Sequence, residues 1–157
     1  MPGRLGLGAD PVTALTVRVD GTPRPQGSKR HVGHGVLVEM SKDLAPWRQA
    51  ISWHTRAALN GGGTFLPAGP VWVNMQFFLA RPKGHYGVGR NLGNVKAGAP
   101  PYPTGRPDVD KLARAAMDGL AIGGAFTDDS QVIELLTVKR WADPATPPGV
   151  WIRVYTR

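Results

Sequence analysis

The stretch VWVNMQFFLA at residues 71–80 carries the strongest strand pattern in the chain. Every second residue from Val71 to Phe77 is apolar, so one face of this strand is expected to be buried. A buried face needs a covering layer of secondary structure. The helical spacing of apolar residues predicts that layer as a pair of helices, one at 45–59 and the other at about 110–121.

Working outward from this strand, further segments alternate in the way that is typical of strands. They are residues 15–19, 36–40, 132–141 and 150–155. The order β-β-α-β-α-β-β predicts an α+β fold, a single domain with a mixed or antiparallel sheet of about four to five strands and two main helices. We expect this domain to span residues 14–157, after a flexible N-terminal leader at 1–13. Loops rich in Gly and Pro are expected at 21–35 and 81–107.

The composition favours a nucleic-acid partner. The 157 residues include 19 Lys and Arg against 11 Asp and Glu, and the net charge of +8 attracts polyanions. The absence of cysteine excludes disulfides, thiolate zinc sites and cysteine nucleophiles. No segment approaches the roughly 20 consecutive apolar residues of a membrane helix, so we expect a cytoplasmic protein without a membrane partner.

Acidic residues gather in one short part of this basic chain. Residues 108–134 hold six of the acids and only two bases. If the backbone is extended through Asp110, the side chains of Asp108 and Asp110 point to the same side, where they repel each other unless a cation neutralises them. Asp128 and Asp129 come just before a predicted strand. Carboxylate oxygens without cysteine suit a hard cation such as Mg²⁺, which activates water and stabilises the charge on a cleaved phosphodiester.

Ordinary structural roles would explain the same acids. Asp108 or Asp110 would serve as a helix N-cap. Asp110, Arg114 and Asp118, each one helical turn apart, would form a solvated row of ion pairs. Asp128-Asp129 is a common turn composition. The residue pattern alone leaves the catalytic and the structural interpretation open.

A longer motif surrounds these acids. The chain reads RPDVDKLARAAMDGL at 106–120 and DDSQV at 128–132, and Lys139 follows on the next predicted strand. This pattern resembles that of the RusA-type Holliday junction resolvases, in which D-x-D-N-x-x-K-x-x-x-D-x-L is followed by D-D-x-Q-V and a strand lysine. The segment GTPRPQGSKR at 21–30 is similar to the N-terminal loop of phage-type members. It points to a bacterial cell or a phage-infected host.

The resemblance implies a homodimeric, Mg²⁺-dependent endodeoxyribonuclease, with Mn²⁺ as an alternative ion. Such an enzyme resolves Holliday junctions by paired nicking of opposing strands in DNA recombination and repair. Its metal ligands map to Asp108, Asp110 and Asp129, with Asp128 beside them. The alternative activity is that of a replication-fork or flap endonuclease with the same site.

Substitutions at two motif positions bear on catalysis. Lys111 stands where the family has Asn, and Arg114 stands where the family has its active-site Lys. Arg114 keeps a positive charge for phosphate but does not give up a proton. We include both among the candidate catalytic residues. If the family lysine must shuttle a proton, the chain would instead be a catalytically inactive protein that binds branched DNA. Asp118 matches a recurrent acidic position whose role could be structural.

Basic residues elsewhere are candidates for contacts to DNA. Those expected to contact it near the site are Lys29, Arg30, Lys42, Arg48, Arg106 and Lys139. Those expected to form a second clamp are the loop residues Arg81, Lys83, Arg90 and Lys96. Contacts to phosphate set the affinity and its salt dependence rather than the choice of sequence. The predicted partner is therefore branched DNA, either a four-way junction or a fork.

Overall fold

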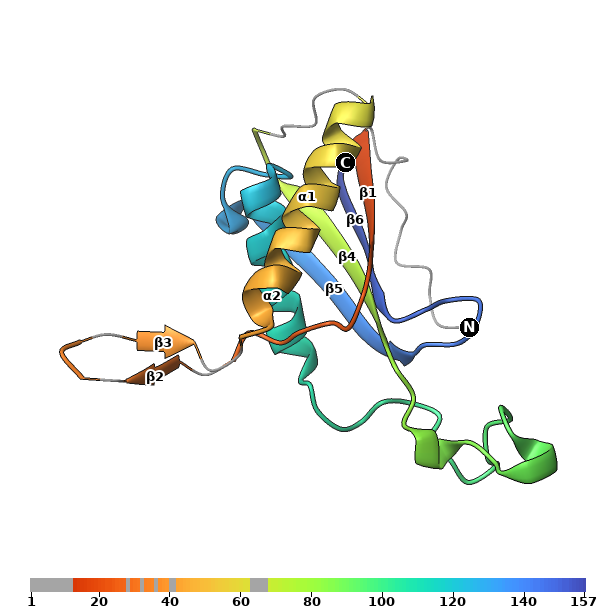
Figure 1. Cartoon of the computed structure of the whole chain (residues 1–157). Helices are drawn as coiled ribbons and strands as arrows, with labels where there is room; N and C mark the ends of the chain where they lie inside the picture. The colour runs from red at the N-terminus through yellow and green to blue at the C-terminus, as the bar shows by residue number, and fades with distance from the viewer. Residues whose placement is uncertain (1–12, 28, 32, 36, 40–41, 63–67) are drawn as a thin grey trace.

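A mixed sheet covered on one face by a pair of helices forms the body of the protein. The computed structural model describes residues 13–27, 29–31, 33–35, 37–39, 42–62 and 68–157 (Figure 1). The sheet has four strands, which in spatial order are β1 (Thr13–Asp20), β6 (Gly149–Thr156), β4 (Val71–Leu79) and β5 (Val132–Trp141). The predicted α+β class and the mixed sheet are confirmed.

The strand at 71–79 lies inside the sheet, as its apolar sequence predicts. β4 pairs antiparallel with β6 and parallel with β5. Its first residue is paired with Val132 and its last, Leu79, with Trp141, so β4 and β5 begin at the same end of the sheet. This parallel arrangement requires a crossover between the two strands. The chain makes that crossover through α2.

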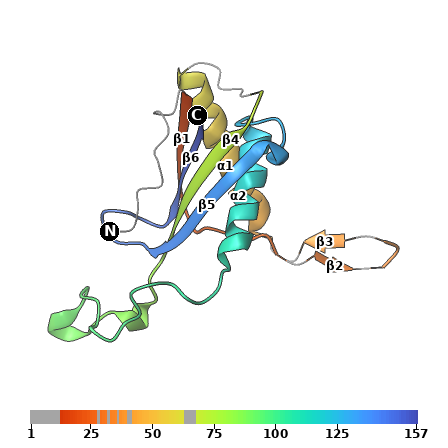
Figure 2. The same ribbon diagram turned by 180° about the vertical axis from the view of Figure 1, so that it is seen from behind.

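Both helices lie on the same face of the sheet (Figures 1 and 2). Helix α1 spans Leu44–Gly62 and helix α2 spans Val109–Gly123. They approach each other closely at the two glycines Gly119 and Gly123, where a Cβ atom would lie under 3.0 Å from side chains of α1. In the part of the chain that the structure describes, neither helix is long and apolar enough to cross a membrane.

A small hairpin lies apart from the main sheet. Strand β2 (Lys29–His31) pairs antiparallel with β3 (Leu37–Glu39). The strand predicted at 36–40 is therefore present over its described residues, but it does not join the main sheet. The prediction of a loop throughout 21–35 is wrong, because β2 lies within that segment. Of the leader predicted at 1–13, Thr13 begins β1, and residues 1–12 lie outside the described residues.

The long connection between β4 and α2 has its own local structure. It contains the short 3-10 helices η1 (Lys83–His85) and η2 (Gly89–Asn91), and it protrudes beyond the end of the sheet (Figure 1). Isolated bridges join Tyr86 to Val95 and Gly87 to Leu92. The N-terminus of α2 lies between this connection and the β2–β3 hairpin (Figures 1 and 2).

Candidate active site

The first two acids of the motif lie at the N-terminus of α2. Asp108 is the N-cap residue, with extended backbone angles, but its side chain makes no capping hydrogen bond. Asp110 lies in the first helical turn, where the helix dipole stabilises a negative charge. The backbone is therefore helical at Asp110, and the extended conformation considered from the sequence is not present. Both carboxylates are exposed to solvent, so they are available to ligands.

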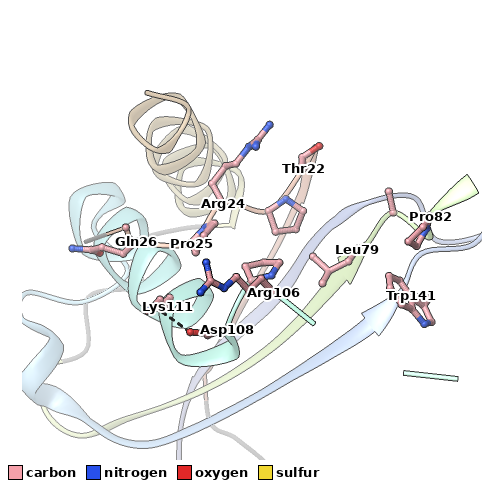
Figure 3. Close-up of a pocket in the computed structure, with 14 residues that line it drawn as sticks. Thr22, Arg24, Pro25, Gln26, Leu79, Pro82, Arg106, Asp108, Lys111 and Trp141 are labelled. Atoms are coloured by element: carbon pink, nitrogen blue, oxygen red, sulfur yellow. Dashed lines mark ion pairs between the residues drawn. The ribbon is translucent and has the colours of Figure 1, made fainter. Parts of the chain in front are cut away.

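A cavity of about 690 Å³ opens beside Asp108 (Figure 3). Residues 22–27, from the Pro-rich loop after β1, line one side, while Leu79 and Trp141 from the ends of β4 and β5 line the other (Figure 3). The loop is held against the helix because the backbone N–H of Gln26 donates to the carbonyl of Lys111, at 3.0 Å. The cavity is therefore built from four separate segments of the chain.

Basic residues lie on the same cavity as the carboxylate of Asp108. Lys111 forms an ion pair with it at 3.1 Å, and both side chains are about half exposed (Figure 3). Such exposed pairs contribute little net stability, on the order of 0–1 kcal/mol, so a stronger cation can displace Lys111 at small cost. Arg106 lines the same cavity. Sequence reasoning did not select Arg24 and Gln26, which also line it; their only signal is the Pro-rich segment that contains them.

Lys139 fastens the chain just before Asp108. Its Nζ donates to the carbonyl oxygens of Gly105, at 2.8 Å, and Pro107, at 3.0 Å. The strand lysine of the motif thus fixes the approach of the backbone to the helix. A charged donor bonded twice to the backbone is a stronger tether than a neutral one.

The remaining motif residues of α2 differ in their surroundings. Arg114 is exposed one turn after Asp110, on the same side of the helix. Asp118, a further turn along, lies 3.4 Å from the guanidinium of Arg48 on α1. This pair joins the two helices, which agrees with a structural role for Asp118. It also directs Arg48, predicted to contact DNA, towards α2.

Asp128 is the N-cap residue and Asp129 the first residue of the short helix η3 (Asp129–Gln131), between α2 and β5. The carboxylate of Asp128 accepts a hydrogen bond from the backbone N–H of Ser130, and the side chain of Gln131 accepts one in return from the backbone of Asp128. Hydrogen bonds from Ser130 lower the pKa of Asp128, and the side chain of Ser130 contributes more than its backbone. Asp128 and Asp129 are both exposed, and the side chain of Asp128 is engaged in a capping box.

The two acidic pairs of the motif lie at opposite ends of α2. The 15 residues of this helix rise about 1.5 Å each, so its ends are about 20 Å apart. The positions of the two pairs along β4 also show this separation. Asp108 lies by Leu79 at the end of β4, whereas the side chain of Gln131 donates to the carbonyl of Gly69 just before β4 begins. Accordingly, among the described residues no three Asp, Glu or His side chains gather to hold one metal ion. The chain alone does not bring Asp108, Asp110 and Asp129 together.

The other predicted DNA contacts lie between β1 and α1 in the chain. Lys29 and Arg30 belong to β2, whose side chains lie outside the described ones. Lys42 is exposed in the turn before α1.

An exposed carboxylate pair beside basic residues offers ligands for a metal ion of the kind that assists hydrolysis of phosphodiester bonds. Comparison with known families supports this chemistry: the chain matches the family described as Endodeoxyribonuclease RusA over residues 19–155. The chain belongs to that family. It is therefore an endodeoxyribonuclease, a hydrolase whose substrate is the branched DNA of Holliday junctions, and the resemblance noted from residues 106–132 is confirmed. Nucleases of this kind generally use a divalent metal ion. Comparison with curated proteins gives no match.

Proposed function

We propose that the protein is a Mg²⁺-dependent resolvase that acts as a homodimer and nicks opposing strands of a four-way junction during recombination and repair. The observation that carries the proposal is the exposed pair Asp108 and Asp110 at a helix N-terminus, beside a cavity that Lys111 and Arg106 also line. The carboxylates supply oxygen ligands, and the cations supply the positive surface that a phosphate backbone requires.

The donors at this end of α2 suit a hard cation. Asp108 and Asp110 offer carboxylate oxygens to solvent, and neither is buried in a hydrogen-bond network. A bound Mg²⁺ or Mn²⁺ would supply an activated water and charge stabilisation at the phosphorus. Lys111 and Arg114 would hold the phosphate, and Lys139 would keep the backbone before Asp108 in place. Lys111 would leave Asp108 for the phosphate when the cation binds.

A second copy of the chain would complete this ligand set. Asp129 lies at the far end of α2 from Asp110, so it reaches the pair only from another subunit. A two-fold axis across the middle of α2 and β5 places the η3 end of one copy beside the α2 N-terminus of the other. Each of the two equivalent sites would then combine Asp108 and Asp110 of one subunit with the partner subunit's Asp129.

The surface along β5 suits such a contact. β5 is an edge strand of the main sheet, and it exposes Ile133, Leu135 and Leu136 at 61%, 43% and 57%. A long edge strand with exposed apolar side chains is a template for pairing with another strand. An axis near Leu135 and Leu136 would pair these apolar residues with their own copies.

The charges along α2 and β5 also suit an antiparallel contact. Between Ala115 and Val138 the chain has four acids and no Lys or Arg, and this stretch includes the η3 end. The other end carries the bases Arg106, Lys111, Arg114, Lys139 and Arg140. At the η3 end Glu134 is paired with Arg157, and Asp118 is paired with Arg48. The two-fold arrangement would therefore set the remaining acids, Asp128 and Asp129, against the basic end of the other copy, which favours this orientation over the parallel one.

Cleavage of labelled four-way junction, fork and linear duplex of matched sequence tests the proposal. Each substrate is incubated with Mg²⁺, with Mn²⁺ and with EDTA, using the wild-type protein, Asp110→Asn and the control Asp20→Asn. Asp20 is also an exposed acid, paired with Arg18 on β1 at the opposite edge of the sheet. We expect metal-dependent, symmetric nicking of the junction by the wild type and the control only. Cleavage in EDTA, or full activity of Asp110→Asn, would contradict the proposal. If the protein cleaves the fork in preference to the junction, the fork is its substrate instead.

A further inference from the structure

Most of the protruding connection between β4 and α2 lies outside the candidate active site, and only its two ends line the cavity beside Asp108. We call residues 81–106 the arm. The arm leaves the sheet after Leu79 and returns at Asp108, so it is attached at both ends to the candidate active site. It carries five Lys and Arg residues and no acid. Figure 1 shows it extending away from the sheet, on the other side of the α2 N-terminus from the β2–β3 hairpin.

Hydrogen bonds within the arm give it a defined shape. The backbone N–H of Gly87 donates to Asn94, and that of Lys96 donates to His85, at 2.9 and 2.8 Å. Gly87 is required at its position, because a Cβ there would lie 2.6 Å from the side chain and the carbonyl of Asn91. A side chain carried on such a folded segment loses less conformational freedom on binding than one on an unstructured loop.

The arm is also fixed to the end of the sheet through Trp141. The indole Nε1 donates to the carbonyl of Pro100 at 2.9 Å, and the ring contacts His85 edge-on, with centroids 5.4 Å apart. Arg81 lies over the same indole, 5.1 Å from the ring centroid, and donates to Pro100 at 3.0 Å. The base of the arm is therefore set relative to β5, and through β5 relative to Lys139 and Asp108.

These contacts divide the four arm cations expected to form a clamp into two kinds. Arg81 is bound to Trp141 and Pro100, and the Nζ of Lys96 donates to the carbonyl of Gly84 at 3.0 Å. Both of these residues hold the arm together. Lys83 and Arg90 are exposed, one on each 3-10 helix, and neither side chain has a hydrogen bond or ion pair with another described residue.

We propose that the arm is a preformed clamp for duplex DNA, in which Lys83 and Arg90 bind backbone phosphates of the duplex that extends from the branch point. The proposal rests on the proposed function, because it places the arm on the same DNA that is cut beside Asp108. The assignment differs from the sequence expectation, since Arg81 and Lys96 position the arm instead of contacting DNA. Phosphate contacts at a distance from the scissile bond would orient the junction without reading its sequence.

The charge of the arm favours DNA over a protein as its occupant. Exposed apolar residues are present at the tip, since Val88 and Leu92 are 81% and 77% exposed. They are set among cations without any acid, and a surface of one sign favours a polyanion. The attachment of the arm at the active site also points to the ligand that the site itself binds. A protein docked on Val88 and Leu92 is therefore the alternative that the experiment must separate.

Salt-dependent binding to a four-way junction tests this proposal. Affinity is measured in EDTA by fluorescence anisotropy over a range of KCl concentrations, for the wild type, Lys83→Ala/Arg90→Ala and the charge-conserving control Lys83→Arg/Arg90→Lys. Each lost phosphate contact lowers the slope of log K against log salt by about 0.9, so we expect the alanine variant to lose about two in slope and roughly tenfold or more in affinity at 0.1 M salt. The control should match the wild type. When the four duplex branches of the DNA junction are shortened step by step, the affinity of the wild type should fall to that of the alanine variant.

Other results would overturn the clamp without affecting the proposed function. An unchanged slope in the alanine variant would do so, as would an equal loss in the charge-conserving control. If the slope is unchanged while Val88→Ser/Leu92→Ser alters the sedimentation of the protein alone, the arm docks protein instead. Binding is measured without metal, so the two proposals fail separately. A wild type that binds with the expected slope but never cleaves would contradict the proposed function and leave the clamp standing.

Discussion

The contact between α1 and α2 at Gly119 predicts the effect of a single methyl group. In Gly119→Ala the new Cβ would lie 2.8 Å from both the Cβ and Cγ2 atoms of Ile51, and 3.0 Å from the carbonyl oxygen of Arg48. Ile51 is fully buried, and a branched side chain in a helix has essentially one favoured rotamer. Neither the side chain nor the backbone of α1 can move aside locally, so the helices must separate.

The size of the effect follows from two opposing terms. Overpacking of a well-packed core costs about 1–3 kcal/mol. Replacing a glycine by alanine inside a helix returns at most about 1 kcal/mol. The 2.8 Å contact with the fully buried Ile51 places the cost in the upper part of its range, at about 2–3 kcal/mol, so the free energy of unfolding is expected to fall by about 1–2 kcal/mol in Gly119→Ala. The separation of the helices would also weaken the Arg48–Asp118 pair, which is already 3.4 Å long.

Urea denaturation followed by circular dichroism measures this change, with an unchanged m-value showing that only stability has altered. The matched control is Gly61→Ala in α1, because nothing lies within 4 Å of a Cβ at that position. We expect the control to be neutral or slightly stabilising. A Gly119→Ala protein as stable as the wild type would refute the close packing of α1 and α2.

Three further substitutions separate the roles assigned around α2. Asp110→Asn should lower junction cleavage at least a hundredfold, since metal-assisted stabilisation is worth several kcal/mol, while junction binding in EDTA stays within about threefold; retained cleavage would remove Asp110 from the site. Lys139→Met should lower the cleavage rate without changing the salt slope of binding, because its Nζ is held by Gly105 and Pro107; a slope reduced by about one would make it a phosphate contact instead. Asp118→Asn should cost about 1 kcal/mol in urea denaturation and leave cleavage intact, because it removes one partly buried ion pair of 3.4 Å; loss of cleavage in a folded protein would make Asp118 catalytic.

Periodic apolar residues made most of the fold predictable. The alternation in 71–80 predicts β4, and the helical repeats predict α1 and α2 to within a few residues of their observed ends. The hairpin was harder, because Lys29–His31, which pairs with β3, contains no apolar alternation. The structure within 81–107 was also hidden, since its turns depend on glycine geometry and on contacts with Trp141, which is distant in sequence.

The acidic motif was visible in the sequence, but its three-dimensional division was not. Asp108 and Asp129 are separated by a helix that runs the length of the sheet, and a linear motif does not show that they lie at its opposite ends. Likewise, the motif marks Lys139 and Asp118 without showing that one tethers Pro107 and the other pairs with Arg48. These roles depend on which elements pack side by side.

Subunit complementation tests the shared active site most directly. Asp110→Asn and Asp129→Asn are prepared separately and as co-expressed mixtures carrying different tags, and nicking of a labelled junction is measured with Mg²⁺. If each site combines Asp110 of one subunit with the partner subunit's Asp129, a mixed dimer has one doubly altered site and one intact site. Random pairing would then restore about a quarter of the wild-type sites, seen as single nicks, although each variant alone is inactive. A mixture that stays as inactive as its components, with mixed dimers recovered through both tags, would contradict a site shared between subunits.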